Sequence, residues 1–229
     1  MWDISPIDLA AVTWLVVCWF GYTVFAERRA PHGNLIGIMA VHREQWMMRM
    51  LARENRIVDT QIVIGAINNA TFFASTSILI LAGLFAVLGA PDEVLALVGD
   101  VPFAVKTTRG LWEIKVIAMM LVFVHGFFKF AWSMRQFNYC ALLIGAAPPE
   151  TEPPESNRDY AMATARVASL AAKHLNHGMR SYYFSMAALV WFIHPWLMFP
   201  AALVVVLVMY RREFRSRTLV ALRACAPKK

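Results

Sequence analysis

The chain has 229 residues, of which 59% are hydrophobic, and its formal net charge at pH 7 is +7. This composition is too apolar for an ordinary water-soluble domain, so lipid must form part of the protein's solvent. The Lys and Arg residues cluster at the ends of apolar runs, without the interleaved aromatic residues of a nucleic-acid groove. We therefore interpret the charge as a topological signal, with attraction to anionic lipid headgroups second, and expect no nucleic-acid partner.

The cysteines argue against a disulfide-bonded or zinc-binding protein, and the first apolar run argues against a cleaved signal peptide. Cys18, Cys140 and Cys225 are scattered and odd in number, so they favour free thiols over a disulfide framework or a paired-cysteine zinc site. The first apolar run has no basic segment before it, and it ends in a Glu-Arg-Arg sequence at 27–29 instead of small residues. It therefore predicts a retained span instead of a cleaved signal peptide.

Apolar runs long enough to cross a membrane recur along the chain. A helix needs about 20 apolar residues to cross the hydrocarbon core of a bilayer. Residues 6–25, 62–88 and 111–134 meet this length directly. Residues 182–210 are too long for one span and short for two, and they carry a His-Pro-Trp sequence at 194–196.

The distribution of charge decides how this last region is divided. Residues 26–57 carry six Arg against three Glu, and the tail after Tyr210 carries seven Lys or Arg against one Glu, which predicts that both are cytoplasmic. The first five residues and the mildly acidic link after the second span fit the outer side. An odd number of crossings follows, so we expect five spans, the last two near 176–194 and 197–217. One kinked fourth span over 182–210 is the alternative, and it would leave the basic tail outside.

The links between the spans predict two further features. Residues 38–56 place Met, Trp and Leu near one helical face and His and Arg elsewhere, which predicts an amphipathic helix on the inner leaflet. Residues 146–158 contain four Pro and three Glu and predict a flexible acidic loop. Alanines then recur every three or four residues over 161–172, a small face that lets another helix approach closely.

Together these features predict one domain over residues 1–229. We expect an all-α, polytopic transmembrane helix bundle in the bacterial inner membrane. Its N-terminus would be periplasmic and its C-terminus cytoplasmic.

Polar residues within the spans are the candidates for function, because inserting an ionisable group costs about 2.5 to 3.5 kcal/mol and such groups usually face the bundle interior. Asn68 and Asn69 could line a cavity, or they could simply form hydrogen bonds between helices. His125 and Lys129 lie four residues apart on one helical face and could form a functional pair. The alternative is that Lys129 reaches the cytoplasmic interface.

Arginines flank the spans on the side predicted to be cytoplasmic. Arg135 directly follows the third span, and Arg180 precedes the apolar stretch of the fourth. Together with Arg49, Arg53 and Arg56, these two arginines could line an anion-attracting vestibule, or they could anchor the helices to lipid phosphates. The ligand-binding candidates are therefore Asn68, Asn69, His125, Lys129, Arg135 and Arg180.

Histidines offer a weaker case for a metal or haem. His174 and His177 are three residues apart, a spacing that could present two imidazoles to one metal, but no matching carboxylate accompanies them. Haem ligation through these residues, His125 or His194 has less support. No phosphate loop, nucleophile elbow or zinc-protease motif is present, so no catalytic residue and no cofactor is assigned.

Five sequence strings occur in a characteristic order. They are NNATFFAST at 68–76, MRQFNY at 134–139, GMRSYYF at 178–184, WFIHP at 191–195 and YRREFRS at 210–216. With these strings the chain resembles the bacterial membrane family catalogued as domain of unknown function 599, over nearly its whole length. The resemblance implies a small multi-span protein and brings no activity or mapped site.

Three functional hypotheses remain open from the sequence. The first is a small transporter or binding protein for an anionic or amphiphilic ligand that enters from the cytoplasm. The second is an accessory or assembly subunit of a membrane complex, with the alanine face and the surface helix as docking surfaces, and a homo-oligomer belongs to the same class. The third is a membrane enzyme with a His-ligated metal or haem.

Overall fold

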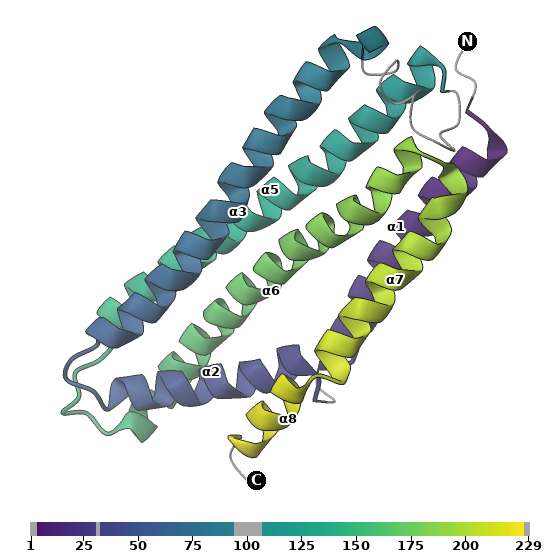
Figure 1. Cartoon of the computed structure of the whole chain (residues 1–229). Helices are drawn as coiled ribbons and strands as arrows, with labels where there is room; N and C mark the ends of the chain where they lie inside the picture. Colours follow the sequence, from purple (N-terminus) through teal and green to yellow (C-terminus); the bar gives the residue numbers. More distant parts are fainter. Residues whose placement is uncertain (1–3, 31–32, 94–106, 227–229) are drawn as a thin grey trace.

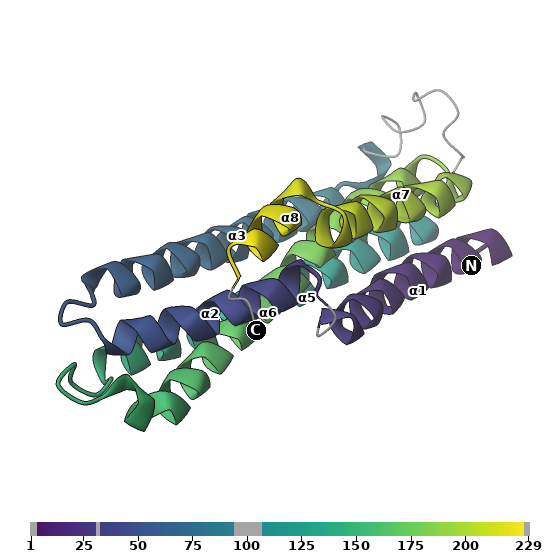
Figure 2. The ribbon, with the colours of Figure 1, turned by 90° about the horizontal axis from the view of Figure 1, so that it is seen from below.

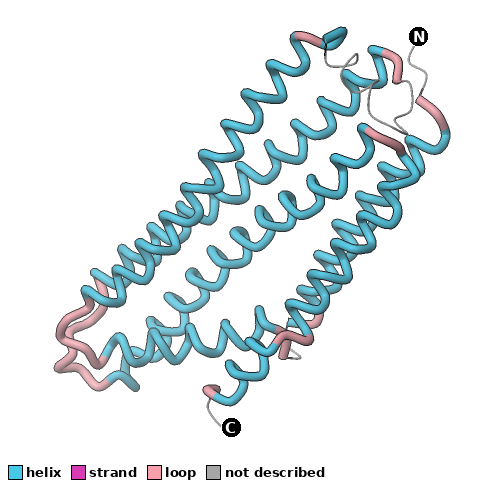
Figure 3. Tube along the Cα trace, in the orientation of Figure 1, coloured by secondary structure: helices cyan, strands magenta, loops and turns pink. Residues whose placement is uncertain are grey.

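The structure is a computed structural model that describes residues 4–30, 33–93 and 107–226. Every regular element within these ranges is a helix, as Figure 3 shows, so the all-α prediction is confirmed for the described residues. The long helices are α1 (Pro6–Arg28), α3 (Ile57–Gly89), α5 (Arg109–Gly145), α6 (Arg158–Leu189) and α7 (Pro195–Phe214). The shorter elements are α2 (Leu35–Leu51), α8 (Arg217–Ala224) and the 3-10 helices η2 (Pro154–Asn157) and η3 (Val190–Phe192).

The helices begin where the sequence supplies capping residues. Ser5 precedes α1, and its Oγ accepts a hydrogen bond from the backbone N–H of Asp8 at 3.2 Å, with Pro6 in the first turn. Thr108 caps α5 in the same way, because its Oγ1 accepts from the backbone N–H of Leu111 at 3.4 Å. Local polar residues thus set the starts of two predicted apolar helices.

A short turn reverses the chain between α6 and α7. α6 ends at Leu189, η3 follows, and α7 starts at Pro195. His194 caps α7, since its Nδ1 accepts a hydrogen bond from the backbone N–H of Trp196 at 3.2 Å. α6 and α7 then run side by side in opposite directions (Figure 1). Residues 182–210 therefore belong to two antiparallel helices and not to one kinked helix.

The long helices run alongside one another between two ends of the bundle (Figure 1). One end, which we call the α2 end, carries α2, α8 and the loop between α5 and α6. The opposite end carries the start of α1, the end of α3, the start of α5 and the turn between α6 and α7. The two Arg-rich segments, around α2 and after α7, therefore lie together at the α2 end.

Neighbouring helices pack in a simple order. α3 packs mainly on α5, α5 packs on α6, and α7 packs on α1 and α6. α3 consequently lies at the rim of the bundle in both views (Figures 1 and 2). This leaves one side of α3 without a neighbour in the described part of the chain.

Small residues let α5 and α6 approach closely. A Cβ atom at Gly178 would lie 2.5 Å from the ring of Phe130, and Ser133 Oγ donates a hydrogen bond to the carbonyl oxygen of Ala171 at 2.8 Å. The small face predicted on α6 is buried, which confirms close packing there. Its buried members are Ala161, Ala165 and Ala168.

α2 lies across the long helices and is anchored to α3. Trp46 Nε1 donates a hydrogen bond to Asp59 Oδ1 at 2.6 Å, and Arg53 forms an ion pair with the same buried carboxylate. The helix differs in bounds from the one predicted over 38–56. It starts earlier because Asn34 caps it, and the residues after Leu51 form the connection to α3. Within the predicted loop 146–158, the last residues form η2.

The outside of the bundle is apolar. α1, α3 and α5 are each long and apolar enough to cross a membrane. Large side chains such as Leu79 and Leu142, which are 73% and 71% exposed, cover the outer surface. Water-soluble proteins rarely expose continuous apolar surfaces of this kind, so the apolar helices are compatible with a membrane protein.

Candidate functional site

Adjoining cavities lie between α2 and the bundle. The largest has a volume of about 410 Å³, and three smaller ones have volumes of about 240, 240 and 120 Å³. Arg43 and Ala172 line both the largest cavity and one of the smaller ones, and Asn176 lines all three smaller cavities. We call the set the vestibule, the largest cavity its apolar compartment, and the three smaller cavities its polar compartment.

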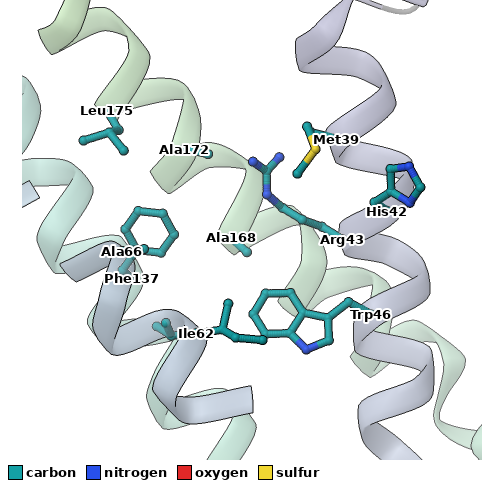
Figure 4. Close-up of a pocket in the computed structure, with 11 residues that line it drawn as sticks. Met39, His42, Arg43, Trp46, Ile62, Ala66, Phe137, Ala168, Ala172 and Leu175 are labelled. Carbon is teal, nitrogen blue, oxygen red and sulfur yellow. The ribbon is translucent and has the colours of Figure 1, made fainter. Parts of the chain in front are cut away.

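The apolar compartment is walled by side chains from four helices. Met39 and Trp46 come from α2, Ile62 from α3, Phe137 from α5 and Leu175 from α6, as Figure 4 shows. Drug-sized ligands occupy cavities of about 300 to 1,000 Å³ with similar apolar walls. The compartment is therefore large enough for an apolar portion of a ligand.

Arg43 stands at the border between the two compartments. Its side chain extends from α2 toward Ala172 on α6 (Figure 4), and it also lines one of the two polar cavities that Glu213 lines. No carboxylate among the described residues forms an ion pair with Arg43. Burial lowers the pKa of the Arg43 guanidinium below its usual range, because removal from water disfavours the charged form. An anion beside Arg43 would relieve this cost.

Arg180 on α6 is the most buried cation of the polar compartment. Its side chain is 3% exposed, and its Nη2 donates to Glu213 Oε1 on α7 at 3.0 Å. Tyr22 on α1 donates its hydroxyl to the other oxygen of Glu213 at 2.9 Å, and the ring of Tyr22 lies 5.4 Å from the Arg180 guanidinium carbon. Arg180 Nε and Nη1 are buried without a hydrogen-bond partner among the described residues. A guanidinium has five N–H donors, so three of them are unused.

A second ion-pair group joins α1 to α6 at the edge of the polar compartment. Lys173 Nζ lies 2.9 Å from Glu27 Oε2, and His177 Nε2 contacts the other oxygen of the same carboxylate. Both oxygens of Glu27 are therefore engaged, and this group holds the end of α1 against the middle of α6.

The vestibule carries an excess of positive charge. Its charged lining residues are Arg43, Lys173, Arg180, Arg212, Glu27 and Glu213. Four cations face two carboxylates, which leaves two uncompensated positive charges with the histidines neutral. Low-dielectric walls strengthen the resulting field, so the vestibule favours anions.

The comparisons with known proteins identify the family and nothing more specific. The family model described as "Protein of unknown function, DUF599" matches residues 10–218. The chain belongs to the DUF599 family. No curated protein and no solved structure matches this DUF599 protein at a significant level. The role of the vestibule therefore has to be argued from its geometry.

Of the six ligand-binding candidates that the sequence nominated in this DUF599 protein, only Arg180 lines the vestibule. His177, which was nominated for a metal, also lines it. His125 lines a separate apolar groove of about 310 Å³ between α1 and α5, and its Nδ1 lies 3.0 Å from Ser181 Oγ. Lys129, one turn along α5, is half-buried and lines none of these cavities. The structure thus does not place His125 and Lys129 together at one cavity.

The other three nominated residues lie on the surface of the chain. Asn68 and Asn69 are exposed on α3, and Arg135 is exposed on α5. None of the three lines the vestibule or the groove at His125. The six candidates therefore do not converge on one site.

The two histidines nominated for a metal have other partners. His174 Nδ1 lies 2.9 Å from the carbonyl oxygen of Leu170, and His177 contacts Glu27. Within the described ranges, no group of three or more His, Cys, Asp or Glu residues is arranged to hold a metal ion. The geometry gives the metal hypothesis no further support.

Sequence reasoning missed most of the polar lining of the vestibule. Lys173, Asn176, His177 and Arg180 recur at spacings of three, one and three residues, so they share one face of α6. This pattern was available in the sequence as a polar stripe on a helix that also carries a small face. Glu213 gave no comparable signal, because it lies among arginines at the end of α7.

Proposed function

We propose that this DUF599 protein is an integral membrane protein that binds an anionic amphiphile in the vestibule, either to carry it across the membrane or to present it to another protein. The observation that carries the proposal is Arg180, a buried cation with unused donors that faces two of the polar cavities.

The membrane part of the proposal extends to five crossings of the inner membrane. α6 and α7 run the length of the bundle beside α1, α3 and α5 (Figure 1), and the long helices connect alternate ends. The Arg-rich segments gather at the α2 end, which favours that end as the cytoplasmic one. α2 would then lie at the level of the lipid headgroups of the inner leaflet, and the vestibule beneath it would be accessible to ligands from that side.

The preference for an anion follows from unsatisfied donors. A buried N–H group without a partner costs roughly 1 to 3 kcal/mol, and more when the group is charged. A carboxylate or phosphate oxygen near Arg180 Nε or Nη1 would satisfy these donors with charge-assisted hydrogen bonds. Glu213 already occupies one edge of the guanidinium, so the ligand would join the existing pair instead of replacing it.

The preference for an amphiphile follows from the contrast between the compartments. The polar compartment holds the charged residues, and the apolar compartment next to it is lined mainly by aliphatic and aromatic side chains. Arg43 lies where the two meet. A ligand with an acidic head and an alkyl or aromatic tail would fit both at once.

A binding assay with matched ligands tests the proposal. We expect the purified protein to bind a fluorescent long-chain fatty acid, and to bind the alcohol of the same chain length at least about tenfold more weakly, because only the acid pairs with the arginines. Arg180→Gln should weaken binding of the acid by about 10- to 100-fold and leave binding of the alcohol unchanged.

Arg166→Gln provides the control, because Arg166 is an exposed arginine on the same helix. This variant should bind the acid as the unmodified protein does. Equal binding of acid and alcohol by the unmodified protein would refute the proposed anion preference. An unchanged affinity for the acid in a folded Arg180→Gln variant would refute the role of Arg180.

A further inference from the structure

The outward side of α3 carries a row of exposed residues, most of them small or polar. α3 lies at the rim of the bundle and packs mainly on α5 (Figures 1 and 2). Exposed residues recur along it at spacings of three and four, the pattern of one continuous helical face. We call this row the α3 face, and its members are Gly65, Asn68, Phe72, Ser75, Leu79, Ala82 and Ala86.

Two side-chain amides on and beside this face lack partners. Asn68 and Asn69 are exposed, and neither side chain forms a hydrogen bond with any residue that the structure describes. They lie within one of the helices that is long and apolar enough to span a membrane. An amide that faces lipid has no hydrogen-bond partner there, which is strongly unfavourable. A partner from outside the described part of the chain would remove this cost.

Glycines on the same side point to close approach by another helix. A Cβ atom added at Gly65 or Gly83 would meet nothing within 4 Å. The fold of the single chain thus gives no steric reason for glycine, although glycine weakens a helix interior. Within membranes, small residues let the backbones of two helices approach closely enough for interhelical hydrogen bonds.

We infer that the α3 face binds the α3 face of a second copy of this chain. Two copies inserted in the same direction are related by an axis along the membrane normal, so identical residues meet at the same depth. Asn68 of one copy would then face Asn68 or Asn69 of the other. An amide contains both a donor and an acceptor, so the amides are complementary to themselves. The α3 face has no ionisable residue, which disfavours a partner chosen by charge.

This inference depends on α3 lying in a membrane but does not depend on ligand binding. The vestibule uses Ile62, Val63 and Ala66 on the side of α3 that faces the bundle. Variants on the α3 face should therefore change association between copies, whereas Arg180→Gln should change ligand binding alone. The two proposals can fail separately.

Disulfide cross-linking in intact membranes tests the inference. The test uses a full-length chain in which Cys18, Cys140 and Cys225 are replaced by Ser or Ala. In that background, Ser75→Cys should give an oxidant-dependent species of twice the chain mass. Leu207→Cys is the control, because Leu207 is an exposed apolar residue on α7, 57% exposed and away from the α3 face. It should give no such species.

A second measurement examines the amides themselves. The double variant Asn68→Ala with Asn69→Ala should weaken association in detergent by about 3- to 30-fold, measured as the dimer fraction against protein concentration by native mass spectrometry. No cross-link at Ser75→Cys in a protein with normal thermal stability would overturn the inference, as would a cross-link to a different protein. If Ser75→Cys does not accumulate, Ala82→Cys on the same face takes its place with the same two outcomes.

Discussion

Arg180 on α6 and Glu213 on α7 lie 3.0 Å apart inside the vestibule, and this ion pair leaves Arg180 Nε and Nη1 buried without a partner. Tyr22 on α1 donates to the same carboxylate, so three helices meet at this pair. A purely structural ion pair would be expected to satisfy more of the guanidinium. These spare donors are the basis of the proposed anion binding.

Removing the charge of Glu213 should strengthen anion binding. In Glu213→Gln, the amide oxygen still accepts a hydrogen bond, but the negative charge that opposes an incoming anion is gone. We expect the affinity for a long-chain fatty acid to rise about three- to tenfold. The unfolding free energy should fall by about 1 to 3 kcal/mol, because a buried ion pair is lost.

Glu155→Gln is the control for this prediction, because Glu155 is exposed in η2 and outside the vestibule. Fluorescence titration and thermal melting of both variants would be compared. Weaker binding in a folded Glu213→Gln variant would mean that Glu213 assists the ligand instead of competing with it.

The contact between α5 and α6 should be sensitive to a single methyl group. A Cβ atom at Gly178 would lie 2.5 Å from the ring of Phe130, so Gly178→Ala forces one helix to shift. We expect the free energy of unfolding to fall by about 1 to 3 kcal/mol and the melting temperature to drop clearly. Tryptophan fluorescence measures the melting. At Gly21 the added atom meets nothing within 4 Å, so Gly21→Ala should melt at or above the temperature of the unmodified protein. Equal melting of the two variants would contradict the packing described here.

The contacts of Asp59 should hold α2 in place over the vestibule. Asp59 is fully buried, and it accepts a hydrogen bond from Trp46 and pairs with Arg53. Asp59→Asn removes the charge and should loosen α2, so amide hydrogen exchange over 35–51 should become about tenfold faster or more. Asp159→Asn, at an exposed position near the start of α6, should leave this exchange unchanged. Unaltered exchange in Asp59→Asn would show that other contacts hold α2.

The orientation can be measured with a native thiol. Cys225 is exposed at the α2 end, whereas Cys140 is buried and Cys18 is half-buried. A membrane-impermeant maleimide should therefore label the protein in inside-out vesicles and not in right-side-out vesicles. Cys225→Ser should abolish the signal. Labelling of Cys225 in sealed right-side-out vesicles would reverse the proposed orientation.

Much of the helical architecture could be predicted from local sequence. Apolar runs of sufficient length predict the long helices, and Ser5 and Thr108 mark two of their starts through capping hydrogen bonds. The turn before Pro195 could be predicted only by combining the length of the apolar region with the distribution of positive charge. The alanine face of α6 predicts its close packing, because small residues allow few other arrangements.

The site could be predicted only in part, because its members come from distant segments. Arg180 was nominated for its position at the start of an apolar stretch, but its partner Glu213 lies 33 residues away. Arg43 lies on an amphipathic helix where an arginine usually contacts lipid headgroups. Asn68 and Asn69 were predicted either to line a cavity or to form hydrogen bonds between helices. They lie exposed on α3, and hydropathy alone does not reveal which side of a span faces the bundle.

The most direct test of ligand binding is to identify what the protein retains during purification. Native mass spectrometry after extraction in a mild detergent should reveal an acidic amphiphile bound to the unmodified protein and to Arg166→Gln. The same species should be absent from Arg180→Gln purified in parallel. Retention of a neutral molecule alone, or equal retention of the acidic species by a folded Arg180→Gln variant, would contradict the account.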